Sequence, residues 1–166
     1  MRKAITVASA VAALSLMAPA FGDEGFSYSF VELGYTSTEI DDLDVDGDGL
    51  GLRGSIEFTD MFHGFASYSD IDLDFDVGAT EMEIGAGLAY PLSPNVDFVG
   101  TVSYLNLEVD LPPGLGGGSV DDSAIALGAG FRGRVGEQLE LTGGLKYAEF
   151  DEGGNDTAFN VGGRYY

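Results

Sequence analysis

The sequence predicts an all-β fold: an eight-stranded antiparallel up-and-down transmembrane β-barrel. Three observations predict this fold. Apolar residues recur with a period of two after residue 22, similar hairpin-like segments follow one another, and short and long connections alternate along the chain. Beyond the N-terminal segment no apolar run is long enough for a membrane-spanning helix. A chain without such helices can cross lipid only as a closed barrel, because only helices and closed barrels pair every backbone group.

Residues 1–22 have the pattern of a secretory signal peptide. Arg2 and Lys3 supply a positive start, residues 4–17 form an uncharged, mainly apolar run, and residues 18–20 (Ala-Pro-Ala) offer a cleavage site. Cleavage after Ala20 or after Gly22 fits equally well, and a retained membrane anchor is the alternative. With the signal removed, residues 23–166 form one barrel domain.

Composition excludes several classes of function. The chain has no cysteine, which removes disulfides, thiolate metal sites, a cysteine nucleophile and a lipid-modified cysteine. It carries 28 acidic and seven basic residues, and two of the basic residues belong to the predicted signal. A surface this acidic repels nucleic acid, so we expect no nucleic-acid partner.

The alternation is clearest in residues 31–35, 50–58, 82–90, 125–135 and 159–165. Residues 64–74 resemble residues 100–110, and residues 143–151 are a third copy. Repeating hairpins of this kind are typical of up-and-down barrels. Tight turns are predicted at 59–61, 91–95 and 136–137, and longer acidic loops at 38–48, 76–80, 111–122 and 152–156. Outer-membrane barrels show this asymmetry, with the long loops outside the cell.

The apolar face is predicted to face lipid, because the charged face is also rich in Gly, Ala and Ser and therefore suits a narrow interior. Tyrosines that fall at one height of the upward strands would form an interfacial girdle: Tyr35, Tyr68, Tyr104 and Tyr147. Other aromatic residues gather near the opposite end: Phe58, Phe62, Tyr90, Phe98 and Tyr165. One irregularity is that Ile71, Leu107 and Phe150 fall out of the apolar phase. A shared β-bulge would cause this, as would strands that continue beyond the bilayer.

Together these features resemble the small OmpA/OmpX-like and opacity-type outer-membrane barrel families, over essentially all of residues 23–166. Residues 160–166 (Asn-Val-Gly-Gly-Arg-Tyr-Tyr) resemble the C-terminal signal that the barrel assembly machinery recognises in such families. The resemblance implies a bacterial outer-membrane location, with outer-membrane lipid and the assembly machinery as partners. It also implies a surface, adhesion or structural role more often than catalysis.

Charged residues of the inward phase are the first candidates for functional residues: Glu32, Arg53, Glu57, Glu83, Arg132, Arg134, Glu140, Lys146 and Arg164. Unpaired buried charge is costly, so we expect these side chains to form ion pairs inside the barrel. The pairs would form a structural plug, or a gate that opens a narrow conduit. Eight strands leave an interior that side chains can fill, which favours the plug.

Three other motifs suggest chemistry. Asp44, Asp46 and Asp48 begin like a calcium-binding loop, although position twelve of that pattern is Ser55 rather than Glu. Weakly bound Ca²⁺ or Mg²⁺ is therefore the only cofactor suggested, and a plain mobile loop is the alternative. Gly-x-Gly-x-x-Gly at 49–54 and 128–133 lies within strands and opens no helix, so it does not predict a nucleotide site. His63 with Ser67 could serve a lipid enzyme, but His63 is expected at the periplasmic end.

The leading hypothesis is a non-enzymatic, monomeric outer-membrane barrel whose acidic extracellular loops contact an unidentified partner. A small channel or carrier for ions or small solutes is the alternative. An outer-membrane lipid-modifying enzyme ranks third.

Overall fold

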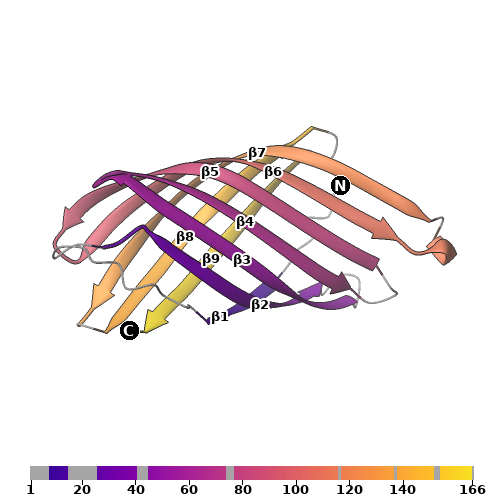
Figure 1. Cartoon of the computed structure of the whole chain (residues 1–166), viewed down its shortest axis with the longest axis horizontal. Coiled ribbons are helices and arrows are strands. Elements are labelled where there is room, and N and C mark those ends of the chain that lie inside the picture. Colours follow the sequence, from indigo (N-terminus) through magenta and orange to yellow (C-terminus); the bar gives the residue numbers. More distant parts are fainter. Residues whose placement is uncertain are drawn as a thin grey trace, which may run out of the picture.

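The computed structural model describes residues 8–14, 26–40, 45–73, 77–115, 117–136, 138–151 and 154–165. Nine strands form one curled, tilted sheet, in which β7, β8 and β9 lie behind β2–β6 (Figure 1). Their bounds are β1 Ala8–Leu14, β2 Phe30–Ile40, β3 Val45–Thr59, β4 Phe62–Leu73, β5 Val77–Ser93, β6 Val96–Leu111, β7 Gly118–Val135, β8 Leu139–Phe150 and β9 Gly154–Tyr165.

Each strand pairs antiparallel with the next in sequence, so the sheet is an up-and-down meander from β1 to β9. Strands β2–β9 are the eight predicted strands. The ninth strand, β1, comes from the segment predicted as signal peptide and pairs with β2 from Leu33 to Glu39. Cleavage of that segment stays a prediction. No helix in the described residues is long and apolar enough to cross a membrane.

The two ends of the sheet differ, and we name them by their connections. At the short-turn end lie the turns at Asp60–Met61, Pro94–Asn95 and around Gly136. At the acidic end the loops that the sequence predicted include residues that belong to strands. Strand β2 runs on to Ile40, β3 begins at Val45, β5 at Val77, β7 at Gly118 and β9 at Gly154, because ladder pairing continues into residues expected to be loop.

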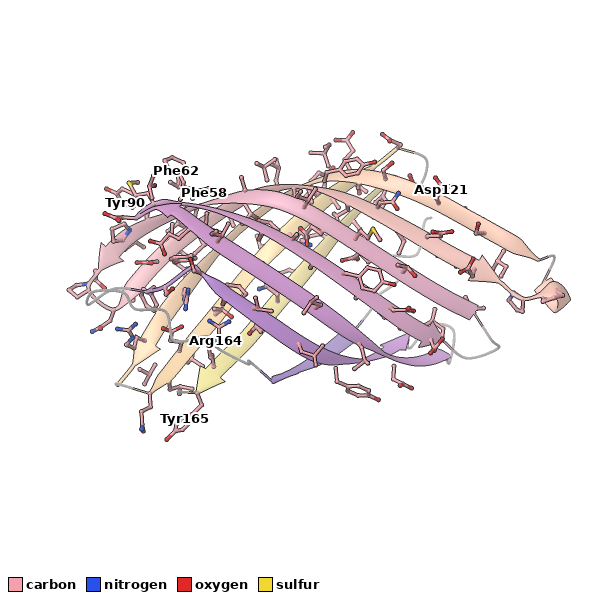
Figure 2. All side chains as sticks on the ribbon, viewed as in Figure 1. Phe58, Phe62, Tyr90, Asp121, Arg164 and Tyr165 are labelled. Atoms are coloured by element: carbon pink, nitrogen blue, oxygen red, sulfur yellow. The ribbon has the colours of Figure 1, made fainter. Side chains whose placement is uncertain are left out.

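Outward side chains over most of the sheet are apolar and open to the surroundings. Val102 is 49% exposed, Ile84 64% and Leu127 58%. The four girdle tyrosines are 40–47% exposed, and Phe58, Phe62 and Tyr90 lie at the end opposite Asp121 (Figure 2). Such a continuous apolar exterior suits lipid rather than water.

The polarity of the two faces reverses at the acidic end. Past Tyr68 the outward residues are Asp70 and Asp72, whereas Ile71 and Leu73 face inward and are partly buried. The same reversal occurs on β6, β7 and β8, where the outward acids are Glu108, Asp110, Asp121 and Glu149. The recorded register shifts lie only near the short-turn end, between Glu57 and Thr59 and between Pro91 and Ser93. A bulge therefore does not explain the out-of-phase residues in the described strands; the strands continue past the apolar belt.

Large inward side chains on β4 face glycines on β5. Phe65 is the ladder partner of Gly85, and His63 is the partner of Gly87. A Cβ added to Gly85 would lie 2.6 Å from the Phe65 ring and 2.6 Å from the carbonyl oxygen of Val102. The glycines of this small inward face therefore make room for ring side chains in a narrow interior, as its residue types predict.

The reversal predicts how stability depends on position along β6. We expect Val102→Arg to destabilise the folded barrel by about 2–4 kcal/mol, because it places a charge in the middle of the lipid-facing belt. Glu108→Arg lies six residues along the same outward phase and is expected to change stability by less than about 1 kcal/mol. The urea midpoint of the folded gel band in lipid vesicles measures both. Equal losses would contradict the position assigned to the belt.

Candidate functional site

The interior charges are gathered into ion pairs along the inward face. Arg132 binds Glu140 through Nε at 2.9 Å and Nη2 at 2.5 Å, and Arg134 reaches the same carboxylate at 3.3 Å. Lys146 Nζ lies 2.8 Å from Glu83 Oε2. Glu83 also accepts a 2.6 Å hydrogen bond from the Ser103 hydroxyl. Further pairing joins β9 to β2, where Arg164 Nη2 lies 2.8 Å from Glu32 Oε1.

Two of the predicted pairing residues contact other groups. Glu57 accepts a 3.1 Å hydrogen bond from the backbone N–H of Tyr28. The Arg53 guanidinium lies 5.3 Å from the centre of the Phe65 ring. Among the described side chains neither forms an ion pair. The prediction that all nine residues pair with opposite charges was too broad, because ring faces and backbone groups also satisfy charge in this interior.

Arg132 is the centre of a larger cluster at the short-turn end. Its side chain is almost fully buried, and its guanidinium lies 4.9 Å from the Tyr28 ring and 5.0 Å from the Phe26 ring. Nη1 donates a 2.8 Å hydrogen bond to the carbonyl oxygen of Ser27. The segment Phe26–Ser29, which precedes β2, is thus held against the inward face, and we call it the N-terminal plug.

Tyr28 anchors the plug. Its hydroxyl donates a 2.8 Å hydrogen bond to Asp97 Oδ2, and its ring stacks on His63 with 4.7 Å between ring centres. Burial, together with the hydrogen bond to Asp97, raises the pKa of the Tyr28 phenol still further above neutral pH, at which an ordinary tyrosine is already protonated. The plug therefore fills the short-turn end with rings and neutral donors.

Apolar side chains fill the interior toward the acidic end. Leu105, Ala124, Ala126 and Ala148 form a buried cluster, and Phe150 packs against it. Below this cluster lie the Glu83 pair and Phe65, which is 6% exposed. The described interior is therefore filled at three successive levels: the plug, the ion pairs and the apolar cluster.

One comparison with known proteins identifies the chain. The family model described as outer membrane protein beta-barrel domain matches residues 6–166. This chain belongs to that family. No curated protein and no solved structure matches the chain.

Membership in the outer-membrane barrel family assigns the apolar outward belt to the outer membrane. The belt lies between Phe58, Phe62 and Tyr90 at one end and the four girdle tyrosines at the other. The acidic end then stands outside the lipid. Residues of like charge are ladder partners there: Asp48 lies opposite Asp72, and Glu108 lies opposite Asp121.

The predicted metal cluster lies in this acidic end. Asp44 lies outside the described residues, as does the side chain of Asp46, while Asp48 is exposed on β3. The backbone from Val45 to Gly49 is extended strand, so these residues form neither the calcium-binding loop that the sequence resembles nor a plain loop. Among the described side chains no three His, Cys, Asp or Glu residues are grouped to hold a metal ion. Weak Ca²⁺ or Mg²⁺ binding at the cluster stays a prediction.

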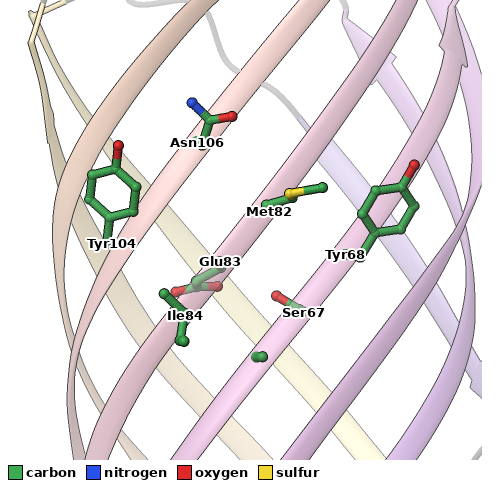
Figure 3. Close-up of a pocket in the computed structure, with 8 residues that line it drawn as sticks. Ser67, Tyr68, Met82, Glu83, Ile84, Tyr104 and Asn106 are labelled. Atoms are coloured by element: carbon green, nitrogen blue, oxygen red, sulfur yellow. The ribbon is translucent and has the colours of Figure 1, made fainter.

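A hollow of about 370 Å³ on the barrel wall is lined mainly by outward residues (Figure 3). Tyr68, Tyr104, Met82 and Ile84 surround the small Ala66, while Ser67 and Glu83 belong to the inward phase of the same strands. A hollow between apolar, lipid-facing side chains has the character of a lipid contact rather than a reaction site.

The structure does not bring His63 and Ser67 together. They lie four residues apart on β4, which separates them by about 13 Å along an extended strand. His63 is instead buried beside Tyr28, and its Nδ1 has no hydrogen-bond partner among the described atoms.

Sequence reasoning missed Tyr28 and Asp97. Asp97 could have been found from the alternation, because it stands one residue before the outward Phe98 and so takes the inward phase. Tyr28 precedes the first strand and follows no alternation, so no periodic signal places it inside the barrel.

Removing the central cation tests the ion-pair cluster. We expect Arg132→Ala to destabilise the barrel by about 3–5 kcal/mol, because it leaves the buried Glu140 without its main partner. Arg134→Ala is the matched control and is expected to cost less than about 1 kcal/mol, since Glu140 keeps Arg132. Urea unfolding followed by gel mobility measures both. Similar losses in the two variants would show that Arg132 is not the main partner.

Proposed function

We propose that this chain is a non-enzymatic, non-conducting outer-membrane barrel that presents a rigid acidic end outside the cell for surface contacts. The observation that carries the proposal is the reversal of face polarity beyond the tyrosine girdle. The strands continue there with outward acids such as Asp72 and Glu108 and inward apolar residues such as Ile71 and Leu107. An acidic exterior over apolar inward side chains is stable in water.

Occlusion of the interior argues against the channel alternative. In the Glu83–Lys146 pair the carboxylate is well buried but the ammonium group is more exposed. The N-terminal plug below this pair and the Leu105 cluster above it leave little room for solute. An eight-stranded barrel has an interior just wide enough for side chains to fill. A conduit would require the plug and the apolar cluster to move together.

The acidic end supplies a defined chemical surface. Its outward acids are fixed on paired strands rather than on long loops: Asp48, Asp70, Asp72, Glu108, Asp110, Asp121 and Glu149. A rigid array of like charge favours cationic partners and steers their approach. The proposal includes export through the predicted signal peptide, with the short turns on the periplasmic side.

Cysteine labelling in intact cells tests the orientation, and the natural chain supplies no background because it lacks cysteine. We expect Ser119→Cys, exposed in the β6–β7 hairpin, to react with a membrane-impermeant maleimide. Ser93→Cys is the matched control, exposed beside the turn at the short-turn end, and is expected to react only after the membrane is permeabilised. The opposite labelling pattern would reverse the topology and remove the proposed surface.

Planar-bilayer recording tests occlusion. We expect the purified protein to insert without large, steady single-channel currents, because three levels of side chains fill its interior. The heat-dependent gel mobility of the same sample verifies that the inserted protein is folded. Steady currents from the folded, unmodified protein would favour the channel alternative instead.

A further inference from the structure

The outward side chains of β5 change from large to small where the tyrosine girdle ends. Ile84 and Met82 line the hollow on the barrel wall, and the next two outward residues toward the acidic end are Thr80 and Gly78. Between residues 78 and 84, which the structure describes throughout, no outward side chain of β5 is charged. This strand therefore forms the floor of a groove that runs from the apolar belt into the acidic end, and we call it the β5 groove.

Acidic side chains stand on both sides of the small part of this floor. Two rows of ladder partners cross β5 there: Asp70–Thr80–Glu108 and Asp72–Gly78–Asp110. In each row the acids on β4 and β6 are two strand spacings apart, or about 10 Å at the backbone. Asp110 leans over the floor, because a Cβ added to Gly78 would lie 3.9 Å from its Oδ2. The four acids are exposed and border a gap that no side chain of β5 fills.

The described part of the chain offers these four acids no cation. All five basic residues after the predicted signal face inward, and no described basic group lies within ion-pair distance of the four carboxylates. Four like charges in two rows repel one another, so a cation that enters the gap relieves this repulsion.

The spacing of the acids selects the kind of cation. A Ca²⁺ or Mg²⁺ ion needs several oxygen ligands within about 2.0–2.6 Å. Among the described residues no three acidic side chains are grouped to hold such an ion. An ammonium group has three N–H donors and can bind carboxylates that stand apart. The gap therefore fits an amine-bearing group better than a metal ion.

The hollow beside the gap is apolar and belongs to the lipid-facing belt. Tyr68 and Tyr104 stand on either side of Met82, and both hydroxyl groups point toward the end of the hollow at which Asn106 lies (Figure 3). The Tyr68 hydroxyl donates a 3.4 Å hydrogen bond to Asp70 Oδ2, so the wall of the hollow continues directly into the acids. The volume of about 370 Å³ falls within the range of about 300–1,000 Å³ that is usual for small-molecule sites.

The width of the hollow favours a hydrocarbon chain over a helix. Tyr68 on β4 and Tyr104 on β6 are two strand spacings apart, so about 10 Å separates their backbones, and the two rings narrow this space further. An α-helix with its side chains is about 10–12 Å wide and does not fit between them. An amphipathic helix is therefore a poorer occupant than a single lipid chain.

We propose that the β5 groove binds a lipid of the outer leaflet whose head carries amine groups, with a hydrocarbon chain in the hollow and the amines among the four acids. The inference rests on the proposed function, because it names the kind of partner that the acidic end receives. The two parts of the groove are adjacent, as they are in such a lipid: Met82 and Thr80 are about 7 Å apart along β5. The hollow alone would accept any lipid chain, and the acids add a preference for a cationic head over an anionic one.

Tryptophan fluorescence tests the class of ligand, because the natural chain has no tryptophan. Tyr104→Trp places a reporter on the wall of the hollow, and Tyr147→Trp is the matched reporter at the same height on β8. Each variant is folded into phosphatidylcholine vesicles and titrated with three probes. The probes share one dibrominated octadecyl chain, which quenches tryptophan on contact, and carry an amine, an alcohol or a sulfate as head.

We expect the amine to half-quench the Tyr104→Trp reporter at a roughly three- to tenfold lower mole fraction than the alcohol, because its head forms ion pairs with exposed acids. The sulfate is expected to need a higher mole fraction than the alcohol. At the Tyr147→Trp reporter the amine and the alcohol are expected to differ by less than about twofold.

Neutralising the first row of acids tests the position of the head. In the Tyr104→Trp chain, Asp70→Asn with Glu108→Gln is expected to bring the amine and the alcohol within about twofold of each other. The matched control, Asp48→Asn with Glu149→Gln, removes two charges of the same kind from outward positions on β3 and β8. We expect this control to keep most of the preference for the amine.

Filling the hollow tests the position of the chain. Ala66→Phe occupies the floor of the hollow, and Ala86→Phe is the matched control at an outward position outside it. We expect Ala66→Phe to weaken quenching by the amine at least about threefold, because it removes apolar contact area, and Ala86→Phe to leave it within about twofold. Heat-dependent gel mobility verifies that each variant is folded.

Four results would overturn the proposal. Equal quenching by the three probes would show that the groove does not select a cationic head. A preference for the amine that survives neutralisation of the first row, and of the second row by Asp72→Asn with Asp110→Asn, would place the head elsewhere. Complete displacement of the amine by an equal amount of a soluble lysine oligomer would assign the acids to a polypeptide partner. Complete displacement by an equal amount of Ca²⁺ at fixed ionic strength would assign them to a metal ion.

The vesicle measurements are independent of the orientation of the barrel in the cell. Failure of the proposed function would appear separately, as labelling of Ser93→Cys rather than Ser119→Cys in intact cells. Failure of the lipid site would appear only in the quenching.

Discussion

In hydrocarbon an unpaired backbone N–H or carbonyl group costs several kcal/mol, and the rest of this structure depends on that cost. Because no stretch after residue 22 could form a spanning helix, the chain pairs its strands in sequence from β2 to β9. Alternation follows, since each strand shows one face to lipid and the other to its neighbours across a narrow interior. The same cost applies to the outer edge of β9, because no described strand pairs with it.

A narrow interior then determines where the scarce cations lie. All five basic residues after the predicted signal are Arg53, Arg132, Arg134, Lys146 and Arg164, and all take the inward phase. Arg132 alone contacts Glu140, Ser27 and two aromatic rings, so it joins β7, β8 and the segment before β2. An arginine suits this place better than a lysine, because its planar guanidinium stacks on rings while it donates hydrogen bonds in its plane. Among the described side chains, Asp97 and Glu57 lie inside without a cation and instead accept hydrogen bonds from Tyr28, whereas acids such as Asp72 and Glu108 stand on the outer surface, where water solvates them.

Much of this arrangement could be predicted from the sequence, because the alternation of apolar and polar residues indicates which side chains lie on each face of a strand. Met82, Glu83 and Ile84 fall on the faces that their polarity predicts, and the pairing of inward arginines with inward glutamates follows from the cost of buried charge. The ends of strands were less predictable. Acidic residues such as Asp72 look like loop residues when they are in fact outward strand residues beyond the lipid, since composition alone does not distinguish an exposed strand from a loop. The position of Tyr28 depends on tertiary contacts with His63 and Asp97, to which no local pattern points.

The out-of-phase residues show how one strand can serve two solvents. In lipid the exterior must be apolar, and the interior can hold charges only if they pair; in water the exterior must be polar, and an unpaired polar interior would fill with water. Strand β6 makes this change on both faces at the same height. Its outward residues pass from Tyr104 through Asn106 to Glu108, while its inward residues pass from Ser103 to Leu105 and Leu107. The backbone keeps its pleat throughout, so the exchange of polarity, rather than a turn or a bulge, marks where the membrane ends.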